Sequence, residues 1–317
     1  MTESSVETET YSLGPYTLLA EQEPEGRWRV FHAQDPASGN DVTLKVMPGQ
    51  LWDNPERKAR FLREFRQAAM LQHPHIAAIY ETGDADGHVY VAFERVDGAT
   101  LTQFLSDGPM SMAEIAYVGV ALAEALAYAH EQGVRHRDLE AANVQLSAQG
   151  EPKLLNFGLP KVRTDSLSAD GMGPPILGTP SAMSPEQALG RPVDARSEVF
   201  SLGSLLYEMA CGQPAFAGMT ARDTLDAVIE ATPEPLEALR PDLPDDLAMI
   251  VERAMNKDPD RRYQNMSQLA ADLRTFQRRV DSLLGASMRG ARRLPRGVLV
   301  GGGVLLAGLI CWLVAHA

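Results

Sequence analysis

Side chains suited to chemistry occur at four places in this sequence. Lys45 lies in the apolar run VTLKV, and Glu64 lies in FLREFRQAAM. Asp138 lies in RHRDLE with Asn143 five positions later, and Asn156 lies in LLNFG. A lysine can hold an anion as a point charge, and a carboxylate can accept a proton. A carboxamide oxygen is a weak ligand for a hard divalent cation. These residue types are suited to anion recognition and proton transfer.

The pattern of apolar residues predicts the elements that position these side chains. Short alternating runs over 16–46 and 88–96 predict strands. Helical spacing of Phe61, Leu62 and Phe65 predicts an amphipathic helix over 55–71. Further helices are expected from Ser111 to a cap at Gly133 and over 199–211, 220–231, 245–255 and 267–279. The sequence therefore predicts an α+β fold with a small strand-rich lobe, a larger helical lobe and a seam near 97–100.

In order and spacing, these motifs resemble the bacterial eukaryotic-like (Hanks-type) Ser/Thr protein kinase family. The resemblance implies a bilobal protein kinase-like domain over 13–276, with the N-lobe at 13–97 and the C-lobe at 98–276. It also implies transfer of the γ-phosphate of ATP to protein hydroxyl groups with the help of Mg²⁺.

The resemblance assigns catalytic roles to the residues named first. Lys45 matches the strand lysine that holds the α and β phosphates, and Glu64 matches the helix glutamate that pairs with it. Asp138 takes the proton-acceptor position. Asn143 matches a metal-binding amide, and Asn156 stands at a second, degenerate metal position.

Other matched positions support the fold or the nucleotide. His136 and Arg137 belong to the catalytic loop, where Arg137 would reach a phosphorylated activation loop. Glu186 and Arg262 are expected to form a structural ion pair.

The implied nucleotide site is a pocket between the lobes. Val30 would lie above the adenine ring, Leu146 below it and Phe93 behind it. The backbone of the linker from Glu94 to Val96 would form hydrogen bonds with the ring.

Departures from the family pattern gather on the phosphate side of the site. Glu23, Glu25 and Trp28 stand where the family has three loop glycines, whose backbone approaches phosphate closely. Glu140 replaces a lysine, and Asn156 replaces the aspartate that holds Mg²⁺. Carboxylates facing a triphosphate repel it, so we expect weakened binding of ATP and Mg²⁺.

Three functions follow from this mixture of retained and altered residues. The favoured one is a pseudokinase that signals by binding another protein, such as an active kinase or a substrate protein. The second is an active but atypical Ser/Thr protein kinase. The third is a switch that binds a nucleotide without metal and without turnover. The formal net charge of −13 argues against a nucleic-acid partner.

Charge and hydropathy also predict a membrane anchor. Residues 274–296 contain seven arginines and one acid, so this segment carries +6 and the remainder −19. The nineteen uncharged residues of 297–315 would span roughly 28 Å as a helix, close to a hydrocarbon core of about 30 Å. We therefore expect a disordered tail at 1–12, a basic juxtamembrane linker at 277–296 and a transmembrane helix at 297–315.

This anchor implies a location and a mode of pairing. The arginines favour a single-pass, tail-anchored topology in the cytoplasmic (inner) membrane, with the kinase-like domain in the cytoplasm. Gly303 and Ala307 have the spacing of a helix-pairing face, which predicts a homodimer through the membrane helix.

Overall fold

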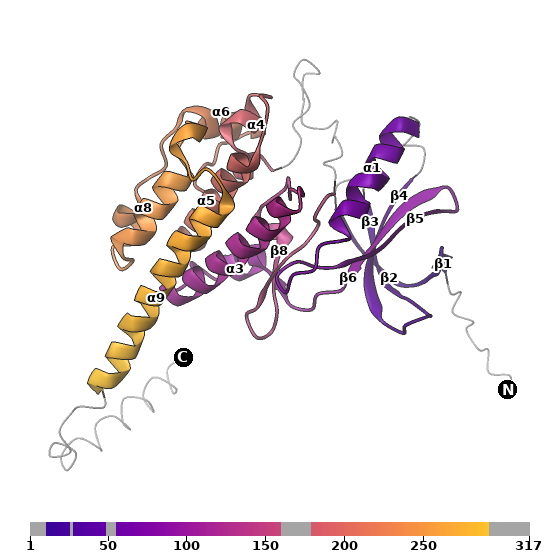
Figure 1. The fold of residues 1–317 in the computed structure, drawn as a ribbon, viewed down its shortest axis with the longest axis horizontal. Coiled ribbons are helices and arrows are strands. Elements are labelled where there is room, and N and C mark those ends of the chain that lie inside the picture. The colour runs from indigo at the N-terminus through magenta and orange to yellow at the C-terminus, as the bar shows by residue number, and fades with distance from the viewer. Residues whose placement is uncertain (1–10, 26–27, 49–54, 160–178, 292–317) are drawn as a thin grey trace, which may run out of the picture.

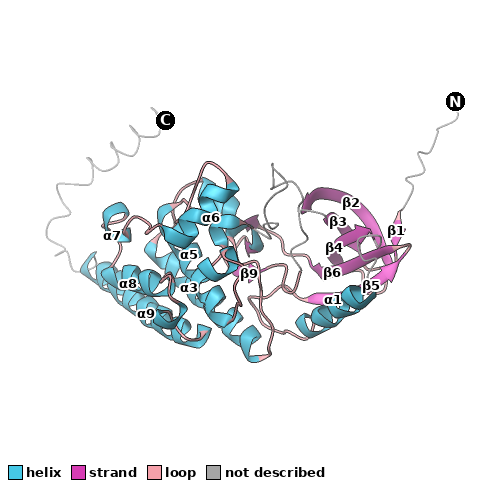
Figure 2. Ribbon diagram, turned by 90° about the horizontal axis from the view of Figure 1, so that it is seen from above, coloured by secondary structure: helices cyan, strands magenta, loops and turns pink. Residues whose placement is uncertain are grey.

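The computed structural model describes residues 11–25, 28–48, 55–159 and 179–291 (Figure 1). A strand-rich lobe with one helix and a larger helical lobe lie side by side, and both views separate them clearly (Figures 1 and 2). The bilobal arrangement confirms the predicted protein kinase fold.

The N-terminal lobe is an antiparallel sheet with the strand order β1-β2-β3-β4-β6-β5. Its strands are β1 (Ser12–Leu13), β2 (Tyr16–Glu25), β3 (Trp28–Gln34), β4 (Asp41–Pro48), β5 (Ile79–Ala85) and β6 (His88–Glu94). Successive side chains of a strand point to opposite faces. Val89, Val91 and Phe93 accordingly join the large core, and Tyr90 and Ala92 join a second, smaller cluster. Both faces of β6 are therefore covered.

The helix α1 (Pro55–Ala68) lies against the sheet (Figure 2). Its aromatic side chains belong to the large core. Phe61 and Phe65 are 5% and 0% exposed, and their ring centroids lie 4.6 Å apart. Phe65 also meets Phe93 of β6 edge-on at 6.5 Å. These aromatic contacts fix the position of α1, the helix that carries Glu64.

The C-terminal lobe is built around two long helices, α3 and α9, which pack along each other (Figure 1). Its helices are α2 (Leu101–Ser106), α3 (Met112–Glu131), α4 (Pro185–Ala188), α5 (Ala195–Cys211), α6 (Ala221–Glu230), α7 (Leu236–Leu239), α8 (Asp245–Ala254) and α9 (Met266–Ala291). A small sheet of β7 (Ala99–Thr100), β8 (Val144–Leu146) and β9 (Pro152–Leu154) faces the other lobe. Single turns of 3₁₀-helix occur at η2 (Ala141–Asn143), η4 (Pro180–Ala182) and η5 (Pro259–Arg261).

Helix α3 is apolar because it forms the centre of this lobe. Ser111 caps it by accepting a hydrogen bond from the backbone N–H of Glu114, and Glu114 returns the bond to the Ser111 N–H. In the described part of the chain, α3 is the one helix whose length and hydropathy match a membrane span. Its most apolar stretch is 61% buried inside the lobe, as expected for a core helix.

The structure differs from the predicted boundaries at both ends of the domain. Ser12, placed in the disordered tail, forms a strand because Leu13 is buried against the sheet. Helix α9 runs to Ala291 and not to Arg279, because Val280 is buried and Arg279 pairs with Asp246 of α8. It therefore covers much of the predicted linker at 277–296. The predicted tail at 1–10 and membrane helix at 297–315 lie outside the described residues.

Candidate functional site

A cleft of about 260 Å³ lies where the two lobes meet. Predicted residues Lys45, Phe93, Glu94 and Val96 line it. The other lining residues are Gln22, Glu25, Thr43, Ala77, Arg95, Asp97, Gly98, Gln145, Leu155 and Asn156.

Two residues predicted for the adenine pocket lie outside the cleft lining in the described part of the chain. Val30 is 2% exposed and Leu146 is 5% exposed, so both are buried in the lobes. The contacts of Val30 and Leu146 with an adenine ring therefore stay a prediction.

The linker between the lobes passes very close to β8. Gly98 has φ +143°, and a Cβ atom there would lie 2.0 Å from the carbonyl oxygen of Leu146. Only glycine fits this conformation and approach. The side chain of Glu94 is held by an ion pair with Lys153 and by the backbone N–H of Ala78, at 3.0 Å. The linker is thus fixed at both ends.

Lys45 is deeply buried and already has an anionic partner. It lies on β4, is 3% exposed, and forms an ion pair with Glu25 at the end of β2. Its Nζ also donates to Oδ1 of Asn156 at 2.6 Å. Burial lowers the pKa of Lys45, and the adjacent Glu25 carboxylate opposes that change. The Glu25 carboxylate therefore stabilises the ammonium charge of Lys45, which would otherwise be buried without an anionic partner.

The two asparagines of the predicted metal site are bonded to each other. Lys45 can only donate, so it orients the Asn156 amide with Oδ1 toward the ammonium group. The Nδ2 atom of Asn156 then donates to Oδ1 of Asn143 at 2.7 Å and to Oε2 of Glu25 at 3.2 Å. The Asn143 Nδ2 in turn donates to the backbone carbonyl of Asp138 at 2.8 Å and lies 3.4 Å from Oε1 of Glu140.

In this conformation Lys45 and Glu64, which were predicted to pair with each other, have other ionic partners. Glu64 on α1 accepts from Nη1 of Arg137 at 2.6 Å, across the gap between the lobes. Two features explain these partners. Strand β2 continues to Glu25, which reaches Lys45, and Arg137 points toward α1, where it pairs with Glu64. Arg137 was predicted to reach a phosphorylated activation loop, and residues 160–178, where much of that loop is expected, lie outside the described residues.

Trp28 also lies elsewhere than predicted. Its indole was expected on the phosphate side, but it is 4% exposed and stacks on Phe61 of α1, with centroids 6.1 Å apart and an interplanar angle of 25°. The large apolar surface of the ring favours this burial. Glu23 lies exposed on β2. Of the three predicted loop departures, Glu23, Glu25 and Trp28, Glu25 is the one that contacts Lys45.

A buried network supports the catalytic loop. His136 is fully buried, donates from Nε2 to the carbonyl of Leu155 at 2.7 Å and meets the Phe157 ring edge-on at 4.7 Å. Its Nδ1 accepts from the backbone N–H of Asp138 at 3.3 Å. This arrangement makes His136 a structural residue, as its matched position implied.

Glu198 braces the same loop from α5. It accepts from the backbone N–H of Arg137 at 2.7 Å and pairs with Nε2 of His130 at 2.7 Å. Burial acts to raise the pKa of Glu198, but these hydrogen bonds and the nearby histidines outweigh it and lower that pKa. Sequence reasoning missed His130; a histidine near the end of an otherwise apolar helix was the available signal.

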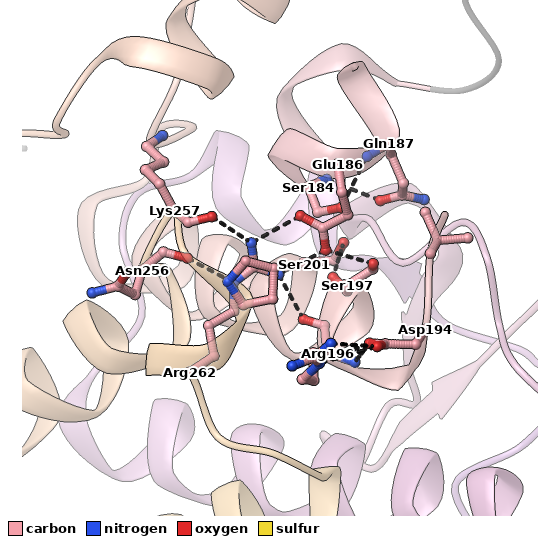
Figure 3. A network of polar contacts seen from close by, with 12 residues as sticks. Ser184, Glu186, Gln187, Asp194, Arg196, Ser197, Ser201, Asn256, Lys257 and Arg262 are labelled. Carbon is pink, nitrogen blue, oxygen red and sulfur yellow. Dashed lines mark hydrogen bonds and ion pairs between the residues drawn. The ribbon is translucent and has the colours of Figure 1, made fainter. Parts of the chain in front are cut away.

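The ion pair predicted between Glu186 and Arg262 forms in the C-lobe core (Figure 3). Two parallel bonds of 2.8 and 2.9 Å join the side chains, and Arg262 is 1% exposed. Ser197 donates to the same carboxylate at 2.6 Å, and backbone carbonyls of Asn256, Lys257 and Arg196 accept the remaining guanidinium hydrogens. Burial acts to raise the pKa of Glu186, but the bonds from Arg262 and Ser197 dominate and lower it.

The strand-rich lobe with one helix, the helical lobe and the cleft between them define a protein kinase fold. Residues 27–273 match the sequence profile of the protein kinase domain, and the chain belongs to the Ser/Thr protein kinase family.

The chain is similar to several bacterial members of this family. It is 35% identical over 268 residues to a probable serine/threonine-protein kinase of Streptomyces coelicolor, a match covering 83% of this chain and 39% of the relative. It is 36% identical over 253 residues to the serine/threonine-protein kinase PknB of Mycobacterium tuberculosis, covering 78% and 40%. The match thus spans about two fifths of the length of these relatives. Among solved structures, the PknI kinase domain of Mycobacterium tuberculosis matches with a TM-score of 0.67 and 26% identity, covering 86% of this chain and all of that one.

The family generally binds ATP and Mg²⁺, but the donor set here does not fit the metal. Asn143 and Asn156 are neutral amides bonded to each other, and the Asn156 oxygen also accepts from the lysine. A hard divalent cation prefers charged or water oxygens. Within the described residues, no group of three or more His, Cys, Asp or Glu side chains is arranged to hold a metal.

Proposed function

We propose that this chain is a kinase-like signalling protein with impaired phosphotransfer, a pseudokinase that acts by binding other proteins. The observation that carries this proposal is the closed network of Glu25, Lys45, Asn156 and Asn143. In an active kinase the corresponding groups bind phosphates and metal. Here they bind one another.

Electrostatics gives the size of the effect. Two unit charges 4 Å apart interact by about 4 kcal/mol at an effective dielectric constant near 20. A triphosphate would have to displace Glu25 from Lys45 and lie near Glu140, and no aspartate at position 156 would hold the Mg²⁺ that offsets its charge. Since about 1.4 kcal/mol corresponds to tenfold in rate, a loss of about 5 kcal/mol slows phosphotransfer by more than a thousandfold.

The proposal is tested by phosphotransfer to a general protein substrate, together with thermal shift measurements with ATP, each with and without Mg²⁺. We expect the full-length protein to transfer no phosphate and to show no Mg²⁺-dependent shift. Asn156→Asp removes the amide donor and supplies a carboxylate, so we expect a Mg²⁺-dependent shift to appear in this variant. Phosphotransfer by the unmutated protein that Asp138→Asn abolishes would overturn the proposal.

A second candidate is an active, atypical Ser/Thr kinase acting on protein hydroxyl groups. Two observations favour it: Lys45, Asp138 and Asn143 are all retained, and the relatives at 35% and 36% identity carry the name of serine/threonine kinases. In this case a bound nucleotide would have to release Lys45 from Glu25. The same assay, with Asp138→Asn as its control, decides between the two candidates.

We also propose that residues 297–315 anchor the protein in the cytoplasmic membrane, with the kinase-like domain on the cytoplasmic side. The uncharged apolar run and the preceding arginines support this placement. We expect the full-length chain to remain in the membrane fraction after alkaline carbonate extraction, and a variant without 297–317 to be released. Release of the full-length chain would contradict the anchor.

The predicted homodimer through the membrane helix is tested by cross-linking in membranes, with Gly303→Leu as the control.

A further inference from the structure

The anion position of the cleft is already filled by the protein itself. The carboxylate of Glu25 pairs with Lys45 and accepts from Nδ2 of Asn156 at 3.2 Å. A phosphate oxygen placed there would form the same two interactions, because it is an anionic acceptor for the ammonium group and for the amide N–H. Glu25 is 49% exposed, so it enters from the rim of the cleft while Lys45 remains buried at 3%.

The other cation of the cleft lining is paired as well. Nε of Arg95 donates to Oδ1 of Asp97 at 3.1 Å, within the linker. Both cationic residues that line the cleft, Lys45 and Arg95, thus have a carboxylate partner from this chain. Glu94, whose ion pair is with Lys153, adds a third carboxylate to the lining. An incoming polyanion finds no uncompensated positive charge among these residues.

The linker side of the cleft keeps groups that suit a neutral ring. Within the described residues, no hydrogen bond occupies the backbone N–H or carbonyl of Val96. Phe93 supplies an aromatic wall and Thr43 lies opposite it in the strand pairing. The volume of about 260 Å³ is below the range of about 300–1,000 Å³ of typical small-molecule sites, which favours a compact ligand.

We propose that this cleft binds an uncharged nucleoside-like heterocycle, such as adenosine, and that Glu25 takes the place of the ligand's phosphate on Lys45. The inference rests on the proposed function, because it concerns the same impaired site. It inverts the usual order of affinity: each added phosphate brings charge toward Glu25 and weakens binding. The ligand needs no metal, because it carries no phosphate to neutralise.

The test measures the affinity of the full-length protein for adenosine, AMP, ADP and ATP by calorimetry, without and with Mg²⁺. We expect affinity to fall along this series, with adenosine at least about tenfold tighter than ATP. Glu25→Gln should raise the affinity for ATP at least about tenfold and change that for adenosine less than twofold. Glu23→Gln removes the same charge from the same strand without touching Lys45, and should leave both affinities within twofold.

The outcomes separate this inference from the proposed function. Tighter binding of ATP than of adenosine, without phosphotransfer, overturns the inference and leaves the proposed function standing. The same holds for a protein that binds no adenosine. Phosphotransfer by the unmutated protein overturns the proposed function. An ATP affinity that rises equally in Glu23→Gln and Glu25→Gln would show that overall charge, and not the contact with Lys45, sets the preference, which also overturns the inference.

Discussion

Arg262→Met is expected to lower the free energy of unfolding by about 3–5 kcal/mol, measured by urea denaturation. Methionine fills a similar volume but leaves the Glu186 carboxylate buried without its guanidinium partner. The loss is large because Arg262 is 1% exposed and its hydrogen-bond partners, Glu186 among them, lie within the C-lobe. A decrease below about 1 kcal/mol would show that water reaches the carboxylate.

Two variants and a pH series complete this experiment. Glu186→Gln combined with Arg262→Met should recover part of the loss, since it leaves no buried charge. Arg274→Met breaks the half-exposed ion pair with Glu124 and should lower the free energy of unfolding by less than about 1 kcal/mol.

The stabilisation by Glu186 depends on pH. Folding lowers the pKa of Glu186, so its contribution to the free energy of unfolding is present above the ordinary carboxyl value of 4.5 and is lost as pH falls. The difference between the native protein and Arg262→Met should therefore narrow in acid.

Trp28→Ala is expected to destabilise the protein by about 3–5 kcal/mol, because it opens a cavity between β3 and α1. The indole is 4% exposed and stacks on Phe61, so its removal also loosens the helix that carries Glu64. We expect faster hydrogen exchange at the amides of α1, measured by mass spectrometry.

Met70 provides the matched control, because it follows α1 and is 77% exposed. Met70→Ala should change the free energy of unfolding by less than about 0.5 kcal/mol. Trp28→Phe should recover part of the loss, since a smaller ring still contacts Phe61. Equal exchange rates in α1 for the native protein and Trp28→Ala would contradict a supporting role for the indole.

Elements with strong periodicity were predictable from the sequence. The helix predicted over 245–255 occurs at Asp245–Ala254, and that predicted over 220–231 occurs at Ala221–Glu230. Short elements were harder. β5 (Ile79–Ala85) was missed because its run IYETGDA alternates weakly, and only pairing with β6 makes it a strand.

The sequence predicted which residues gather at the site, but not which side chains form ion pairs there. Lys45, Asn143 and Asn156 do lie together, as their motifs implied. Which carboxylate reaches Lys45 depends on where β2 ends and on how α1 packs, and neither is encoded near the lysine. Glu64 and Glu25 carry the same charge, so electrostatics alone cannot choose between them. The indole of Trp28 is a similar case: its burial depends on Phe61, distant in sequence.

The bonds across the lobes affect how freely the molecule opens and closes. Arg137 joins the catalytic loop to α1 through Glu64, and Asn156 joins the other side of the cleft to both Lys45 and Glu25. These contacts restrict hinge motion before any ligand arrives. A protein that binds across both lobes therefore meets a surface that is already shaped, and association loses less conformational entropy than it would with a freely hinged partner.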